Sequence, residues 1–78
     1  MISIPLMVHR DGSNKLWGRY RFIDLPSPGD RVNITDDRGR VQKLRVMHVA
    51  HEPLRDDVAD PSDRDLAWVH AEWLEEFY

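Results

Sequence analysis

The chain has 78 residues, of which 41% are hydrophobic and 32% charged, and its formal net charge is −3. These values indicate one small globular domain, residues 1–78, and exclude a disordered chain. The absence of cysteine excludes disulfides and thiolate chemistry and suits a reducing cytoplasm, where we expect the protein to act. The first residues, MISIPLMVHRDG, fit neither a signal peptide nor a membrane segment, so no membrane association is expected.

The first predicted element is a strand over SIPLMVH, because its hydrophobic side chains alternate between two faces. The side chains expected on one face are those of Ile2, Ile4, Leu6 and Val8. Pro5 has no N–H group, so we expect this strand to run along a sheet edge or to begin beyond a bulge. Asp11-Gly12 then predicts a tight hairpin turn into a second strand, LWGRYRFIDL.

The middle of the chain predicts a short strand and a long, bent one. PSPGD interrupts strand pairing, RVNIT is typical of a third strand, and DDRG of a tight turn. The fourth strand, RVQKLRVMHVAH, contains two inward-facing pairs that are out of phase, Leu44 with Val46 and Val49 with His51. A β-bulge near Met47-His48 would turn both pairs inward and bend the strand, which predicts that the sheet closes into a barrel.

After the acidic loop EPLRDDVADPSDRD, the segment LAWVHAEWLEEFY fits two structures. As a strand it places Ala67, Val69, Ala71 and Trp73 on one face. As a helix it has a capping box at Ser62 and Asp65, with Leu66, Val69, Trp73 and Phe77 along one stripe. We favour the strand, because a curled four-stranded sheet needs a closing strand, and keep a short C-terminal helix as the alternative. The predicted fold class is therefore all-β with five strands.

These segments resemble the SH3-like small barrels, in particular short uncharacterised bacterial proteins with that topology. The resemblance lies in IDLPSPGDRVNI, LRVMHVAHEP and VHAEWL and covers roughly residues 17–74. It implies an opening hairpin, a Pro-Gly-Asp turn into a short strand, and a bent strand ending in Val-x-His. The chain differs from signalling SH3 domains because it lacks their pattern for an acidic, aromatic-lined peptide groove.

Charge is distributed unevenly along the chain. Residues 15–45 contain eight Lys and Arg against four Asp, a net charge of +4, whereas residues 46–78 contain two Arg against nine acidic residues, a net charge of −7. The two parts could form a polar binding surface or neutralise each other, and we favour the second interpretation.

Little in the sequence indicates catalysis or a cofactor. Four histidines, His9, His48, His51 and His70, invite a zinc hypothesis with Glu52 or Glu72 as a further ligand. However, His48 and His51 point to opposite faces of a regular strand, so we expect no metal site unless a bulge redirects one of them. The Asp-rich loop lacks the pattern of a calcium site, and no nucleophile elbow or phosphate loop is present. We therefore predict a non-enzymatic protein without cofactor, metal or small-molecule substrate.

Two functional hypotheses remain. The leading one is a protein-interaction or assembly module that binds another protein or self-associates through exposed strand edges and C-terminal aromatic residues. Its candidate interface consists of Trp68, Trp73, Phe77 and Tyr78. The alternative is a barrel that binds single-stranded nucleic acid through interleaved aromatic and basic residues. Its candidate face consists of Trp17, Arg19, Tyr20, Arg21, Lys43 and Arg45.

Overall fold

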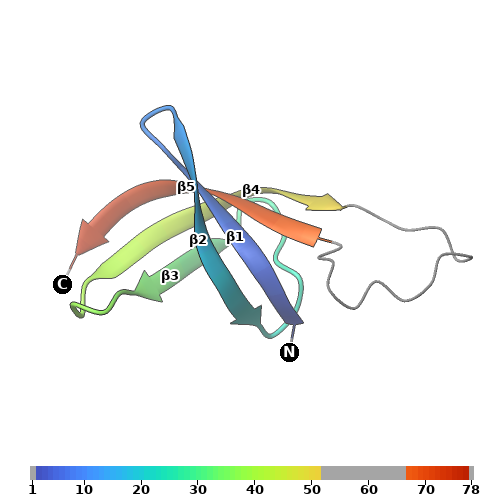
Figure 1. Cartoon of the computed structure of the whole chain (residues 1–78), viewed down its shortest axis with the longest axis horizontal. Helices are drawn as coiled ribbons and strands as arrows, with labels where there is room; N and C mark the ends of the chain where they lie inside the picture. Colours follow the sequence, from blue (N-terminus) through green and yellow to red (C-terminus); the bar gives the residue numbers. More distant parts are fainter. Residues whose placement is uncertain (1, 52–66, 78) are drawn as a thin grey trace, which may run out of the picture.

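The computed structural model describes residues 2–51 and 67–77, which form one five-stranded sheet curled into a half-barrel (Figure 1). Its strands are β1 (Ile2–Arg10), β2 (Ser13–Phe22), β3 (Arg31–Thr35), β4 (Val41–His51) and β5 (Ala67–Phe77). Their order across the sheet is β2-β1-β5-β4-β3. All neighbours pair antiparallel except β1 and β5, which are parallel. The prediction of an all-β fold with five strands is confirmed.

The C-terminal segment is a strand, so the helical alternative is wrong. β5 lies between β1 and β4 and pairs with both of them. Val69 and Ala71 are fully buried there. A period of two places both on the core face, next to Trp73, which packs against the core. The capping-box positions Ser62 and Asp65, the acidic loop of residues 52–65, and Leu66 lie outside the described residues.

The Asp11-Gly12 turn is confirmed. Arg10 and Ser13 are the last pair of the β1–β2 ladder, so Asp11 and Gly12 alone make the turn. Their φ angles are 51° and 79°, as in the type I′ turns that match the twist of a hairpin. The paired part of the hairpin is longer than predicted, because β2 begins at Ser13 and not at Leu16. At its other end β2 stops at Phe22, and Ile23, which we had placed in the strand, is 93% exposed.

The prediction that Pro5 marks a sheet edge or a strand that begins beyond a bulge is wrong, since β1 begins at Ile2 and its register shifts only after Leu6. β1 is an internal strand with β2 on one side and β5 on the other, and Pro5 is buried. The proline is tolerated because the β1–β5 ladder begins only at Leu6, directly after it. Along its first residues β1 is therefore paired on one side only, which is where a residue without an N–H group fits.

The predicted bulge in β4 is confirmed, but it does not close a barrel. The β4–β5 register shifts between Val46 and His48, so that Met47 has no partner. Val46 is buried and Val49 packs against the core, whereas His51 is exposed. The sheet stays open because β5 inserts between β1 and β4 and leaves β2 and β3 as its two edges. No Cα atoms of these two edge strands approach within 8 Å of each other.

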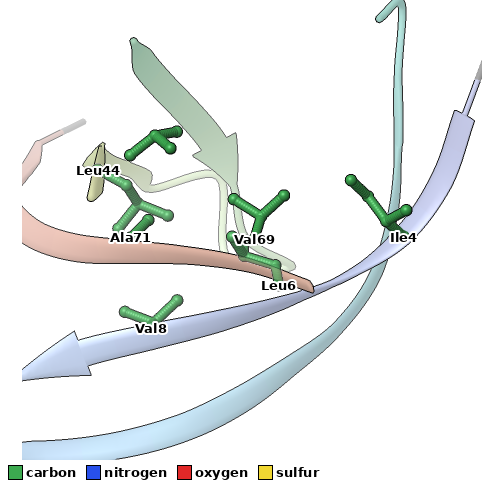
Figure 2. Packing of buried hydrophobic residues seen from close by; sticks show 7 residues of the cluster. Ile4, Leu6, Val8, Leu44, Val69 and Ala71 are labelled. Carbon is green, nitrogen blue, oxygen red and sulfur yellow. The ribbon is translucent and has the colours of Figure 1, made fainter. Parts of the chain in front are cut away.

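The core lies on the inner face of the curled sheet and draws on β1, β4 and β5 (Figure 2). Its buried residues are Ile4, Leu6, Val8, Leu44, Val46, Val69 and Ala71. The isoleucine, leucine and valine side chains among them contribute about 1.5–3 kcal/mol each when fully buried. The Pro-Gly-Asp turn, which directly precedes β3, is hydrogen-bonded to β4. The Gly29 N–H donates to the Val46 carbonyl at 2.8 Å, and the Val46 N–H donates to the Asp30 carbonyl at 2.9 Å. Among the described residues, no helix is long and apolar enough to cross a membrane.

Candidate interaction surface

A second bulge, in β2, turns Trp17 toward the inner face of the sheet. Leu6 pairs with Gly18 and Met7 with Leu16, so Trp17 is the extra residue. Gly18 has a φ of +130°, a conformation that side-chain-bearing residues rarely adopt. In a regular strand Trp17 would share a face with Arg19, two residues away. Because of the bulge it instead packs against the core together with Tyr20.

The open side of the half-barrel contains a cleft between the two edge strands. Its volume is about 620 Å³. It is lined by Lys15, Leu16, Trp17 and Tyr20 of β2, Ile34 and Thr35 of β3, and Asp36, Asp37 and Gln42. A second hollow of about 430 Å³ lies further along, between the end of β2 and the start of β3. We call the gap between β2 and β3, with both hollows, the seam.

Asp36 builds the rim of the seam at the turn between β3 and β4. Its Oδ1 accepts hydrogen bonds from the backbone N–H groups of Arg38 and Arg40, each at 2.9 Å. The bond from Arg40, together with that from Arg38, holds the pKa of the Asp36 carboxyl below its ordinary value, against a smaller opposing effect of burial. The carboxylate therefore stays charged at neutral pH and fixes the turn. Neighbouring Asp37 is exposed at the same rim.

A buried glutamine connects this rim with β5. Gln42 is only 8% exposed and lies in the seam. Its Oε1 accepts a hydrogen bond from Trp73 Nε1 at 2.8 Å. Its Nε2 donates to Glu76 Oε1 at 2.6 Å and to Asp36 Oδ2 at 3.4 Å. All the polar atoms of its side chain thus have partners, which is what a buried amide requires.

The C-terminal aromatic residues do not lie together. Trp73 points inward, with the Arg10 guanidinium carbon 3.8 Å from the centre of its ring. Trp68 belongs to the opposite face, and its Nε1 is buried without a hydrogen-bond partner among the described residues. Phe77 is 40% exposed, and Lys43 Nζ lies 4.7 Å from its ring centre. Tyr78 lies outside the described residues.

The structure also separates the aromatic from the basic members of the predicted nucleic-acid face. Trp17 and Tyr20 pack against the core, whereas Arg19 and Arg21 alternate with Tyr20 and are exposed on the other side. Arg19 donates a hydrogen bond to the Ser3 carbonyl at 2.8 Å. Lys43 and Arg45 are on β4, and β1 and β5 lie between them and β2.

Basic β4 and acidic β5 pair with each other. Arg45 forms an ion pair with Glu72, and Lys43 Nζ lies 3.4 Å from Glu75 Oε1. A third pair joins Arg40 and Glu76 at 3.6 Å. This arrangement supports the interpretation that the two parts of the chain neutralise each other. Each exposed pair contributes at most about 1 kcal/mol, so their main effect is on the charge of this face.

Three of the four histidines meet on the outer face of the sheet. The Met47 bulge places His48 opposite His70, and their rings stack with centroids 4.5 Å apart. His9 Nε2 and His70 Nδ1 share a hydrogen bond of 2.9 Å. His51 stays apart, exposed at the end of β4. No group of three His, Asp or Glu side chains within residues 2–51 and 67–77 has the geometry to hold a metal ion.

The seam was missed by our sequence analysis, although a signal for it was present. An isolated glycine inside a strand pattern, as at Gly18, indicates a bulge, and that bulge places Trp17 in the cleft that Ile34 and Asp36 also line. The chain matches no family model, no curated protein and no solved structure.

Proposed function

We propose that this protein is a small non-enzymatic interaction module that binds an extended segment of a partner protein along the seam. The observation that carries this proposal is the pair of strand edges, β2 and β3, that have no further strand partner within residues 2–51 and 67–77 and lie on either side of an aromatic cleft. An extended peptide can add to such an edge through main-chain hydrogen bonds, while a pocket accepts every second side chain. Here the pocket is the space between Trp17, Tyr20 and Ile34.

The occupant we propose is another protein and not a second copy of this chain. The two edges carry four exposed basic residues, Lys15, Arg19, Arg21 and Arg31. Charged side chains on edge strands oppose the pairing of identical edges, because they bring like charges together. A foreign segment with apolar side chains at alternate positions meets no such repulsion.

We also propose that the half-barrel is an SH3-like barrel with an open seam. Its opening hairpin, its Pro-Gly-Asp turn and its bent β4 support this assignment. A bound segment lying between β2 and β3 would complete the ring of strands. An experimental structure of a complex with the segment outside the seam would contradict the proposed binding site.

The test is a selection of random peptides on the full chain, followed by amide NMR titration with the selected peptide. We expect shift changes at Trp17–Phe22 and Arg31–Thr35, and loss of binding in Trp17→Ala. Phe77→Ala is the matched control, since it removes an exposed aromatic ring outside the seam. Loss of binding in Phe77→Ala with retention in Trp17→Ala would place the interface at the C-terminal aromatics instead. A parallel titration with a single-stranded oligonucleotide at low salt tests the nucleic-acid alternative.

A further inference from the structure

The two halves of the sheet are joined by a short contact. The hairpin β1–β2 forms one half and the antiparallel strands β3, β4 and β5 form the other. Among the described residues, their shared ladder comprises four residue pairs, from Leu6 with Val69 to His9 with Glu72. We call this ladder the junction. On its inner face the buried side chains of Leu6, Val8, Val69 and Ala71 hold it together.

The outer face of the junction carries the histidine cluster, His9, His48 and His70. His70 occupies the centre, because it pairs with Met7 of β1 on one side and with His48 of β4 on the other. Its ring stacks on His48 and lies 5.2 Å from the ring of His9, centroid to centroid. The hydrogen bond between His9 and His70 thus spans the two halves of the sheet.

We propose that the histidine cluster makes the junction proton-sensitive, so that mild acid weakens the contact between β1 and β5. A pair of imidazoles that shares one hydrogen bond can take up a single extra proton, because one ring nitrogen must remain an acceptor. A second proton would place two N–H groups face to face and remove the bond. Imidazolium ions at these ring distances would also repel each other, as like charges do.

The surroundings offer little compensation for positive charge. The acidic side chain nearest in register is Glu72 of β5, opposite His9, but it is already paired with Arg45 of β4. On the β2 side the register places Leu16 and Asn14, both uncharged, beside Met7 and His9. Burial, and then the charges of His48 and His9, lower the pKa of the His70 imidazole below its ordinary value of 6.5.

The direction of the pH effect follows from this shift. Below pH 6.5 the His70 imidazole takes up a proton in the unfolded chain but stays neutral in the folded protein until the pH reaches its lower folded-state pKa. The free energy of unfolding therefore falls as the pH decreases from 6.5 to that folded-state pKa. Above pH 6.5 the contribution of His70 is constant. This inference does not depend on the proposed binding function.

The experiment compares urea unfolding at pH 7.5 and 5.5, with hydrogen exchange at the amides of residues 6–9 and 69–72 to follow the junction. In the wild type we expect a lower unfolding midpoint at pH 5.5 and lower protection at those of these amides that bond across the junction, corrected for the intrinsic exchange rate. His70→Gln should lose most of this pH dependence. His51→Gln, the same substitution outside the cluster, should retain it in full. If the unfolding midpoint of His70→Gln fell between pH 7.5 and 5.5 by as much as that of the wild type, the proposal would be overturned.

A second measurement keeps the proposal testable if His70→Gln does not fold. Imidazole C–H signals of the wild type, followed by NMR from pH 8 to 4.5, report when His70 takes up its proton. In His9→Gln and in His48→Gln we expect the His70 titration to move upward toward pH 6.5, since each variant removes one neighbouring ring. A His70 titration that is unchanged in both variants would contradict the coupling.

Discussion

The bulge in β2 depends on Gly18, and replacing this residue tests the origin of the seam. A Cβ atom at Gly18 would meet no heavy atom within 4 Å, so Gly18→Ala introduces no steric clash. Its cost comes from the backbone alone, because the φ of +130° is unfavourable for residues with a side chain. Conformations of this kind cost about 1–3 kcal/mol. A domain of this length has a free energy of unfolding of roughly 4–12 kcal/mol, so the loss is a substantial part of it.

The assay is urea unfolding followed by tryptophan fluorescence. With a slope of about 1 kcal/mol per molar urea, typical of the smallest domains, the midpoint should fall by roughly 1–3 M. Arg21→Ala is the control on the same strand, since its exposed side chain should change stability by less than about 0.5 kcal/mol. A Gly18→Ala loss as small as that of the control would refute the argument, because the bulge would then not require glycine. The Trp17 indole N–H signal should also shift in Gly18→Ala if the bulge rearranges.

Two further predictions concern the rim of the seam. Gln42→Ala leaves the Trp73 indole N–H without its acceptor. It should lower the free energy of unfolding, measured by urea titration, by about 1–3 kcal/mol. A loss below about 0.5 kcal/mol would show that water replaces the amide. The lowered pKa of Asp36 predicts a stability contribution that is complete above pH 3.8 and is lost as the pH falls below that value through the folded-state pKa. Asp36→Asn should flatten the unfolding midpoint against pH in this acid range, and an unchanged acid profile in this variant would contradict the assignment.

The strands could be predicted from the sequence because their patterns are local. The break in phase between Val46 and Val49 revealed the bulge in β4, since aliphatic side chains have a strong preference for the core. The same break occurs in β2, between Trp17 and Tyr20, but large aromatic residues occur on both faces of small sheets, so the pattern is less informative. Helix and strand were both compatible with residues 66–78, because Val69 and Trp73 lie inward in either structure.

The strand order could not be predicted, because it depends on contacts between residues far apart in the chain. We expected β5 to close a barrel, and it instead lies in the middle of the sheet, between β1 and β4. That position creates both candidate sites. It leaves β2 and β3 as the edges of the described sheet, on either side of the seam, and it brings His70 between His9 and His48. The charges along the sequence indicated that the two parts of the chain neutralise each other, but neither that β4 and β5 would pair nor which strands would remain at the edges.

Both candidate sites also depend on a bulge that reverses the face of a single side chain. In a regular strand successive side chains point to opposite faces of the sheet. One extra residue therefore exchanges the inner and outer positions that follow it. Without the bulge, with Trp17 in regular register, its indole would lie outside with Arg19 and the seam would lose that ring. Without the bulge at Met47, His48 would point into the core and Val49 to solvent. A buried, unpaired imidazole and an exposed valine are both unfavourable, so the hydrophobic pattern that selects the bulge in β4 also places His48 on His70. The proton-sensitive cluster is in this sense a consequence of core packing, and it requires no residue that the fold does not already fix.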